Sequence, residues 1–82
     1  MPATLDFTEL ARVRVRSRRE LPSPTDRRAI RKAAGLTLQE VGAAVGVSGQ
    51  AIGMWEAGSR TPRGPHLERY VDVLRILREA AA

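Results

Sequence analysis

Hydrophobic positions recur at helical spacing between residues 35 and 58, in two short segments that each carry a start signal. Thr37 followed by Glu40 matches a capping box, in which a hydroxyl and a carboxylate satisfy two free backbone N–H groups. Ser48 is placed to cap the second segment. Gly46 lies between them and can adopt the left-handed conformation that ends a helix. The pattern therefore predicts two short helices that are joined by a tight turn and cross steeply.

The helix before this pair is marked by two prolines, Pro22 and Pro24, which disfavour helix in the residues that precede them. Pro24 suits a first helical position with Ser23 as its cap, and Gly35 suits the end. We therefore expect a helix from Pro24 to about Ala34. Its apolar residues predict the face that points inward, namely Ala29, Ile30, Ala33 and Ala34. Its charge is expected on Arg27, Arg28, Arg31 and Lys32.

Apolar stripes predict the core faces of the two capped helices and of a last helix. The residues expected inside the capped pair are Leu38, Val41, Val45, Ile52 and Trp55. Gly42 and Ala44 are small and lie beside this stripe, so the helices can approach closely. Pro65 opens the last helix, which we expect to reach about Ala80. More than half of its circumference is apolar, whereas a helix that packs only on its own small domain needs a narrower stripe. We therefore expect another chain or the N-terminal segment to cover part of it, including Val73, Ile76 and Leu77.

Residues 1–22 form a basic N-terminal segment that two patterns describe differently. Asp6 and Glu9 match a capping box. A helical stripe then runs through Phe7, Leu10, Val13, Ser17 and Leu21. A helix from about Phe7 to Arg19 is therefore the preferred prediction. Arginine and valine alternate over residues 12–16, however, and this alternation is typical of a strand.

The chain has 82 residues, enough for one small domain, which we expect residues 23–82 to form. Because there is no cysteine, neither a disulfide nor a thiolate metal site can hold the fold, and a reducing cytoplasm suits such a chain. The apolar runs are too short to span a membrane, and the N-terminus lacks the apolar stretch of a signal peptide. The single histidine, His66, has no metal-ligating cluster around it, and no catalytic spacing is recognisable. We expect no enzyme, no metal and no cofactor.

The net charge of +5 is unevenly distributed. Residues 1–32 carry nine Lys and Arg against four Asp and Glu, whereas residues 33–82 carry five of each. Such an excess is expected of a face that meets a polyanion, so the N-terminal segment would lie on phosphates or enter a minor groove. The alternative is a solvated charged helix that covers the domain. Thirteen of the fourteen basic residues are arginine, which fits recognition by forked guanidinium groups but is equally explained by a GC-rich coding sequence.

Residues 26–63 resemble the helix-turn-helix domain that phage repressors, Cro-type proteins and the wider Xre family share. The resemblance lies in three stretches in a fixed order, residues 35–37 (GLT), 41–48 (VGAAVGVS) and 52–58 (IGMWEAG). It implies an all-α fold, a compact bundle of four or five helices of the lambda-repressor type. The recognition helix, at about residues 48–57, would lie in the major groove of double-stranded DNA.

The resemblance also implies roles for single residues. Base contacts would come from the groove-facing positions of the recognition helix, Gly49, Gln50, Gly53 and Met54. Phosphates would be held at two helix starts and in the following loop, by Thr37, Leu38, Ser48, Arg60 and Arg63. The N-terminal segment would add phosphate contacts through Arg12, Arg14, Arg16, Arg18 and Arg19. Arg31 and Glu56 match a pair that forms a structural salt bridge in many members of the family.

Two of the groove-facing residues are glycines, which offer no side chain to a base. Gln50 can pair with adenine, and Met54 can contact a thymine methyl group. We therefore expect few direct contacts between side chains and bases. The arginine segment, DNA shape or dimer spacing would then supply the remaining specificity.

These observations support three hypotheses of function. The leading one is a cytoplasmic, nucleoid-associated transcriptional regulator, repressor-like or Cro-like, that binds DNA as a homodimer with half-sites about one helical turn apart. The second is an antitoxin-like or antirepressor module that binds a protein partner through the last helix. The third is a recombination accessory factor that bends DNA.

Overall fold

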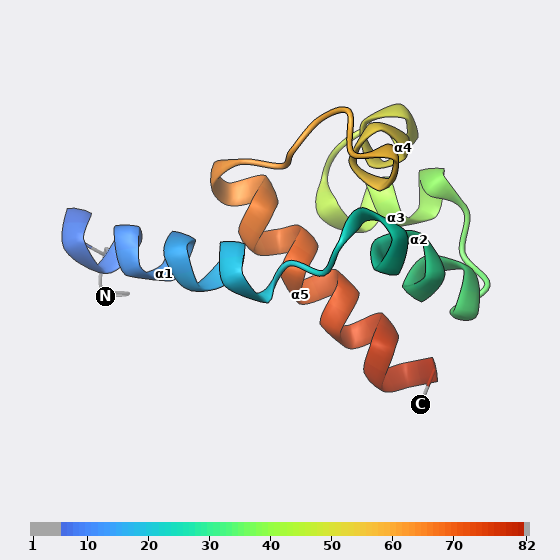
Figure 1. Ribbon diagram of the computed structural model, residues 1–82, viewed down its shortest axis with the longest axis horizontal. Coiled ribbons are helices and arrows are strands. Elements are labelled where there is room, and N and C mark those ends of the chain that lie inside the picture. Colours follow the sequence, from blue (N-terminus) through green and yellow to red (C-terminus); the bar gives the residue numbers. More distant parts are fainter. Residues whose placement is uncertain (1–5, 82) are drawn as a thin grey trace.

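Five helices make up most of residues 6–81, the part of the chain that the computed structural model describes (Figure 1). They are α1 (Phe7–Glu20), α2 (Pro24–Ala33), α3 (Leu38–Val45), α4 (Gly49–Ala57) and α5 (Gly64–Ala81). The predicted all-α bundle is therefore confirmed. Residues 1–5 of the predicted N-terminal segment lie outside the described part. Within residues 6–81, none of the helices combines the length and the apolar character that crossing a membrane requires.

The helix boundaries follow from the local signals in the sequence. The Ser23 hydroxyl accepts from the Asp26 N–H at 3.2 Å and starts α2, while the Ser48 hydroxyl accepts from the Ala51 N–H at 3.1 Å and starts α4. Gly46 ends α3 with φ of 96° and Gly58 ends α4 with φ of 76°, both in the left-handed region. The predicted caps and stops of these helices are confirmed.

The core lies where α2, α3 and α4 meet the middle of α5. Its buried residues are Ile30, Val41, Val45, Ile52, Trp55, Tyr70 and Leu74. The rings of Trp55 and Tyr70 pack at a centroid distance of 4.8 Å and an angle of 45°, a tilted arrangement that aromatic pairs favour. Burial raises the pKa of the Tyr70 hydroxyl to about 12, so this side chain stays neutral at physiological pH. The core thus joins α4 directly to α5.

The inward face of α2 differs from the prediction. Ala29 and Ala33 are exposed, whereas Arg27 is buried with 8% of its surface accessible and lies on the same face as Ile30. Side chains at positions i, i+3 and i+4 share one face of a helix, and here that face contains Arg27, Ile30 and Arg31. Ile30 is buried as expected, but the prediction was wrong for Arg27, which was counted among the charged residues of α2 and not on its inward face.

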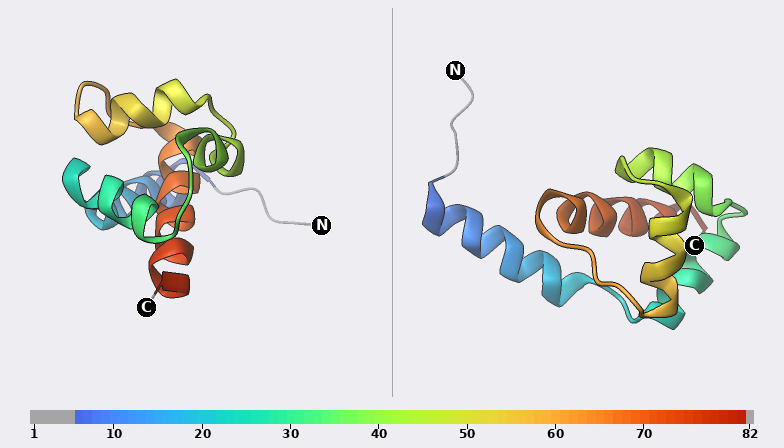
Figure 2. Two further views of the ribbon diagram at one scale, coloured as in Figure 1. Left: turned by 90° about the vertical axis from the view of Figure 1, so that its right-hand side faces the viewer. Right: turned by 90° about the horizontal axis from the view of Figure 1, so that it is seen from above.

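The N-terminal segment is helical from Phe7 to Glu20, so the preferred helix is confirmed and the strand is excluded. At its start the Asp6 carboxylate accepts from the Glu9 N–H at 2.8 Å. This helix, α1, packs against α5 and extends away from the other three helices in the views of Figures 1 and 2. Ser17 is buried on the packed side, but Phe7 is 86% exposed, which corrects its expected place on the buried stripe.

Most of the apolar side chains of α5 are covered by other parts of the same chain. Val73 and Leu77 are half-buried and pack against the core, while Ile76 remains 57% exposed. The N-terminal segment accounts for part of the excess, because α1 lies along α5. The apolar surface that α5 offers to a second chain is therefore narrower than expected.

Candidate nucleic-acid interface

A tight turn sets the angle between α3 and α4. The N–H groups of Gly46 and Val47 both donate to the Gly42 carbonyl, at 2.7 and 2.9 Å. A Cβ atom built on Gly42 would lie 2.6 Å from the Val47 carbonyl oxygen, closer than real Cβ atoms approach. Gly42 is therefore required where the turn folds back over α3. Ala44, which was expected to help this approach, is exposed.

The two glycines of α4 have different surroundings. A Cβ atom on Gly49 would lie 3.1 Å from the backbone nitrogen and Cγ of Gln39, so the first turn of α4 is pressed against the first turn of α3. On Gly53 the nearest atom would be the Leu38 Cδ1 at 3.6 Å, an ordinary contact distance. Gly49 thus serves the packing of the two helices, whereas a methyl group at Gly53 would make an ordinary contact with Leu38.

Two of the four groove-facing positions predicted on α4 present side chains at its surface, Gln50 and Met54. Gln50 is exposed in the first turn, and Met54 is half-buried one turn later. Thr37 and Ser48, the caps of α3 and α4, are both exposed, so the starts of these helices face solvent. Leu38 is half-buried and packs against the core, which makes it part of the support for this surface. Figure 1 shows α4 at the rim of the bundle, followed by the loop that returns to α5.

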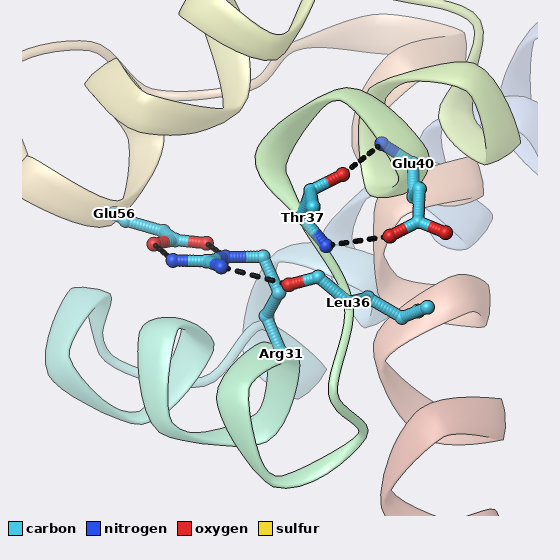
Figure 3. Close-up of polar contacts among 5 residues, drawn as sticks. All are labelled: Arg31, Leu36, Thr37, Glu40 and Glu56. Carbon is cyan, nitrogen blue, oxygen red and sulfur yellow. Dashed lines mark hydrogen bonds and ion pairs between the residues drawn. The ribbon is translucent and has the colours of Figure 1, made fainter.

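Arg31 on α2 fixes the last turn of α4. Its Nε and Nη2 donate to the two carboxylate oxygens of Glu56 at 2.7 and 3.0 Å, and its Nη1 donates to the Leu36 carbonyl at 2.9 Å (Figure 3). Side-chain exposure is 12% for Arg31 and 6% for Glu56, so solvent screens this ion pair little. The hydrogen bond to Glu56 is the main reason why the pKa of Arg31 is raised. The structure thus brings the two residues of the expected salt bridge together.

The capping box at the start of α3 lies beside this ion pair in Figure 3. The Thr37 hydroxyl accepts from the Glu40 N–H at 3.1 Å, and the Glu40 carboxylate accepts from the Thr37 N–H at 2.9 Å. The bond from the Thr37 N–H is the main reason why the pKa of the Glu40 carboxyl is lowered, because it favours the ionised form. Leu36, which precedes the cap, therefore connects the start of α3 to Arg31 and through it to α4.

The arginines that the sequence assigns to phosphate contacts lie in two places. Arg60 and Arg63 are exposed in the loop between α4 and α5. On α1 the exposed arginines are Arg12, Arg16, Arg18 and Arg19. Arg14 is half-buried, and its Nε lies 3.6 Å from a Glu68 carboxylate oxygen on α5. Extensive helix contacts join α1 to α5 and not to α4, so the described structure keeps the basic helix apart from the outer side of α4.

One functional candidate was missed by the sequence prediction. Arg27 donates from Nε to the Pro22 carbonyl at 2.7 Å and from Nη1 to the Trp55 carbonyl at 2.8 Å. Its spacing from Ile30 and Arg31 was the available signal, since these positions share a helix face with it. No local sequence pattern could indicate the bond to the Trp55 carbonyl, because Trp55 is 28 residues away from Arg27.

Comparisons with known proteins agree with this arrangement. The model of a family described as helix-turn-helix, of the Xre-like type, matches residues 28–79. The matched range covers α3, α4 and most of α2 and α5, and it leaves out α1. Neither a search of curated proteins nor a search of solved structures found a match to the chain.

Proposed function

The chain belongs to the Xre-like helix-turn-helix family, whose members are DNA-binding regulators, and from this premise we propose that it is a sequence-specific transcriptional regulator of the repressor or Cro type. The observation that carries the proposal is the geometry of α3 and α4. The turn at Gly46 sets the angle at which α3 and α4 cross. The cap residues of both helices, Thr37 and Ser48, are exposed, and so is Gln50 on the outer side of α4. A helix presented in this way fits the major groove.

In this proposal α4 reads bases and its neighbours hold the backbone. Gln50 would pair with adenine, and Met54 would contact a thymine methyl group. Thr37, Ser48, Arg60 and Arg63 would hold phosphates on either side, with Leu38 packed beneath them. Gly53 supports a close approach of the α4 backbone to the groove, because no side chain stands between them.

The basic helix α1 would add affinity without sequence preference. Its exposed arginines, Arg12, Arg16, Arg18 and Arg19, are suited to phosphates, and such contacts position a protein on DNA without reading bases. Arg14 would contribute less, because Glu68 already lies near its guanidinium. Residues 1–22 and 23–82 would thus act as a charged segment and a reading domain.

We further propose that the regulator binds as a homodimer on a two-fold site. The exposed Ile76, with the half-buried Val73 and Leu77 beside it, is the apolar surface of α5 on which two copies would meet. Half-sites about one helical turn, on the order of 10 base pairs, apart would match such a dimer.

Binding to duplex fragments of the encoding genome, measured at several salt concentrations, tests this function. We expect one or a few fragments to bind at least about a thousandfold more tightly than the others, with affinity falling steeply as salt rises. Gln50→Ala should weaken binding to those fragments, whereas Thr25→Ala, an equally exposed change on α2, should not. Binding that is absent, or that is independent of salt, would exclude the proposed function.

A further inference from the structure

A single buried guanidinium joins two segments that are distant in the sequence. Arg27 holds the Pro22 carbonyl in the linker between α1 and α2, and it also holds the Trp55 carbonyl in the last turn of α4. Both bonds are short, at 2.7 and 2.8 Å, and the side chain is largely shielded from solvent. The linker that carries α1 and the end of α4 are therefore tied to one side chain.

A second contact, between the end of α4 and the start of α2, lies close to the first. Gly58, the residue that ends α4, lies against Pro24, which follows the linker and begins α2. A Cβ atom on Gly58 would meet the Pro24 Cγ at 3.5 Å and its Cβ at 3.8 Å. The end of α4 is thus packed against the start of α2, two residues after Pro22, as well as hydrogen-bonded through Arg27.

The chemistry of Arg27 indicates why a guanidinium occupies this place. Among residues 6–81 no carboxylate lies within ion-pair distance of Arg27, so its charge is compensated by backbone carbonyls. Burial is the main cause that lowers the pKa of Arg27. The carbonyls at the end of a helix form the negative end of its dipole, and α4 has no basic residue in its own last turn. A planar fork with several donors can hold two carbonyls at once, which a single ammonium nitrogen cannot do in the same geometry.

We propose that Arg27 is a positioning residue that fixes the direction of α1 relative to α4. Because α1 also packs on α5, and Tyr70 of α5 packs on Trp55 of α4, the bridge from Pro22 to Trp55 adds a second connection between the segment that carries α1 and the end of α4. The consequence for DNA binding rests on the proposed function, in which α4 reads the groove and the arginines of α1 hold phosphates. The orientation itself does not depend on that function.

The direct test measures the spacing without DNA. The chain has no cysteine, so Thr8→Cys and Gln50→Cys place nitroxide labels at two exposed positions, one on α1 and one on α4. Double electron–electron resonance should give a narrow distance distribution for the otherwise unchanged protein. We expect Arg27→Met to broaden or shift it, while Arg28→Met, an exposed neighbour with the same change of charge, leaves it unchanged. Circular dichroism of each variant checks that its helices are retained.

A second variant keeps the test decisive where Arg27→Met fails to fold. Arg27→Lys retains the positive charge but has one nitrogen in place of the fork, so it should also broaden the distribution. If folded Arg27→Lys, or folded Arg27→Met, gives the same distribution as the unchanged protein, the proposal is wrong.

A measurement with DNA separates this proposal from the proposed function. With a fragment that the protein binds, Arg16→Ala together with Arg19→Ala should lower the affinity at least about twofold less in the Arg27→Met background than in the unchanged protein. If the two arginine substitutions lower the affinity by the same factor in both backgrounds, α1 and α4 are not coupled through Arg27 on DNA. A protein that binds no fragment at all would refute the proposed function, and the label distances would still decide the role of Arg27.

Discussion

Single glycines determine how closely α3 and α4 approach each other. Gly42 is required by the turn and Gly49 by the contact with Gln39, while Gly53 has no neighbour that excludes a methyl group. Glycine inside a helix also destabilises it by roughly 1 kcal/mol relative to alanine. Glycine is therefore needed for close packing at Gly42 and Gly49, whereas the surroundings of Gly53 can accept a methyl group.

Alanine substitutions should distinguish these glycines. We expect Gly53→Ala to raise the free energy of unfolding by about 1 kcal/mol, because the helix gains propensity without a clash. Gly49→Ala should gain less or lose stability, and Gly42→Ala should lose the most, since its methyl group would meet the Val47 carbonyl. Urea unfolding of the three variants measures this order. An equal gain for Gly49→Ala and Gly53→Ala would contradict the close packing of the two first turns.

Protonation of Glu40 should remove part of the stability of α3. The pKa of Glu40 in the folded state lies below its ordinary value of 4.5, so its stabilisation is complete above the unfolded pKa and is lost as pH falls through the folded pKa. Glu40→Gln keeps an oxygen that can accept from the Thr37 N–H but does not titrate. Lowering the pH from about 7 to about 3 should therefore reduce the stability of the unchanged protein relative to Glu40→Gln. Urea unfolding at both pH values measures this. If the difference in free energy of unfolding between the unchanged protein and Glu40→Gln is the same at both pH values, Glu40 does not have this role.

At the scale of elements, contacts at both ends of α4 stabilise it more than the helix propensity of its own residues does. Ser48 caps its start, while Arg27 and Arg31 from α2 hold its last turn. Two glycines in nine residues make an isolated helix of this sequence unfavourable. The orientation of the proposed recognition helix therefore depends on α2.

Breaking the ion pair between Arg31 and Glu56 should be costly because it leaves one charge buried alone. Arg31→Met is expected to lower the free energy of unfolding by about 3–5 kcal/mol. The double variant Arg31→Met with Glu56→Met should lose less than Arg31→Met alone, since no unpaired carboxylate remains. A thermodynamic cycle from urea unfolding gives the coupling. Strictly additive losses would show that the pair does not act as a unit.

The elements that could be predicted are those that local rules specify. Proline, serine and threonine at helix starts and glycine at helix ends placed α2, α3 and α4 within a residue or two. The inward face of α2 was wrong, because burial of Arg27 depends on the Pro22 and Trp55 carbonyls that only the folded chain brings together. The ion pair of Arg31 with Glu56 came from family resemblance and not from any spacing in the sequence.

At the scale of the whole molecule, five of the fourteen basic residues lie on α1, a helix that the family match leaves out. The matched range contains the proposed reading surface, whereas α1 contributes four exposed arginines, Arg12, Arg16, Arg18 and Arg19. The helical form of α1 was predicted from its stripe, but its direction away from the bundle was not, because it depends on contacts between distant elements such as the packing against α5 (Figure 2). Specificity and general affinity would then reside in different parts of the chain.

Two arginine substitutions with the same change of charge should separate these parts. Arg16→Ala on α1 should weaken DNA binding by a similar factor for all sequences and reduce the slope of log affinity against log salt by about one. Arg75→Ala on α5 should leave the slope unchanged, because Arg75 is paired with Asp72 at 3.1 Å on the partly acidic edge of α5. Equal slopes for both variants would contradict a role of α1 on phosphates.

The central claim, that α4 reads DNA sequence, is tested most directly by selecting bound molecules from a pool of random duplex DNA. We predict an enriched motif with two-fold symmetry and half-sites about one helical turn apart, and we predict that Gln50→Ala loses preference at one position of each half-site. A bound pool with no enriched motif, or one whose motif is unchanged by Gln50→Ala, would contradict the account.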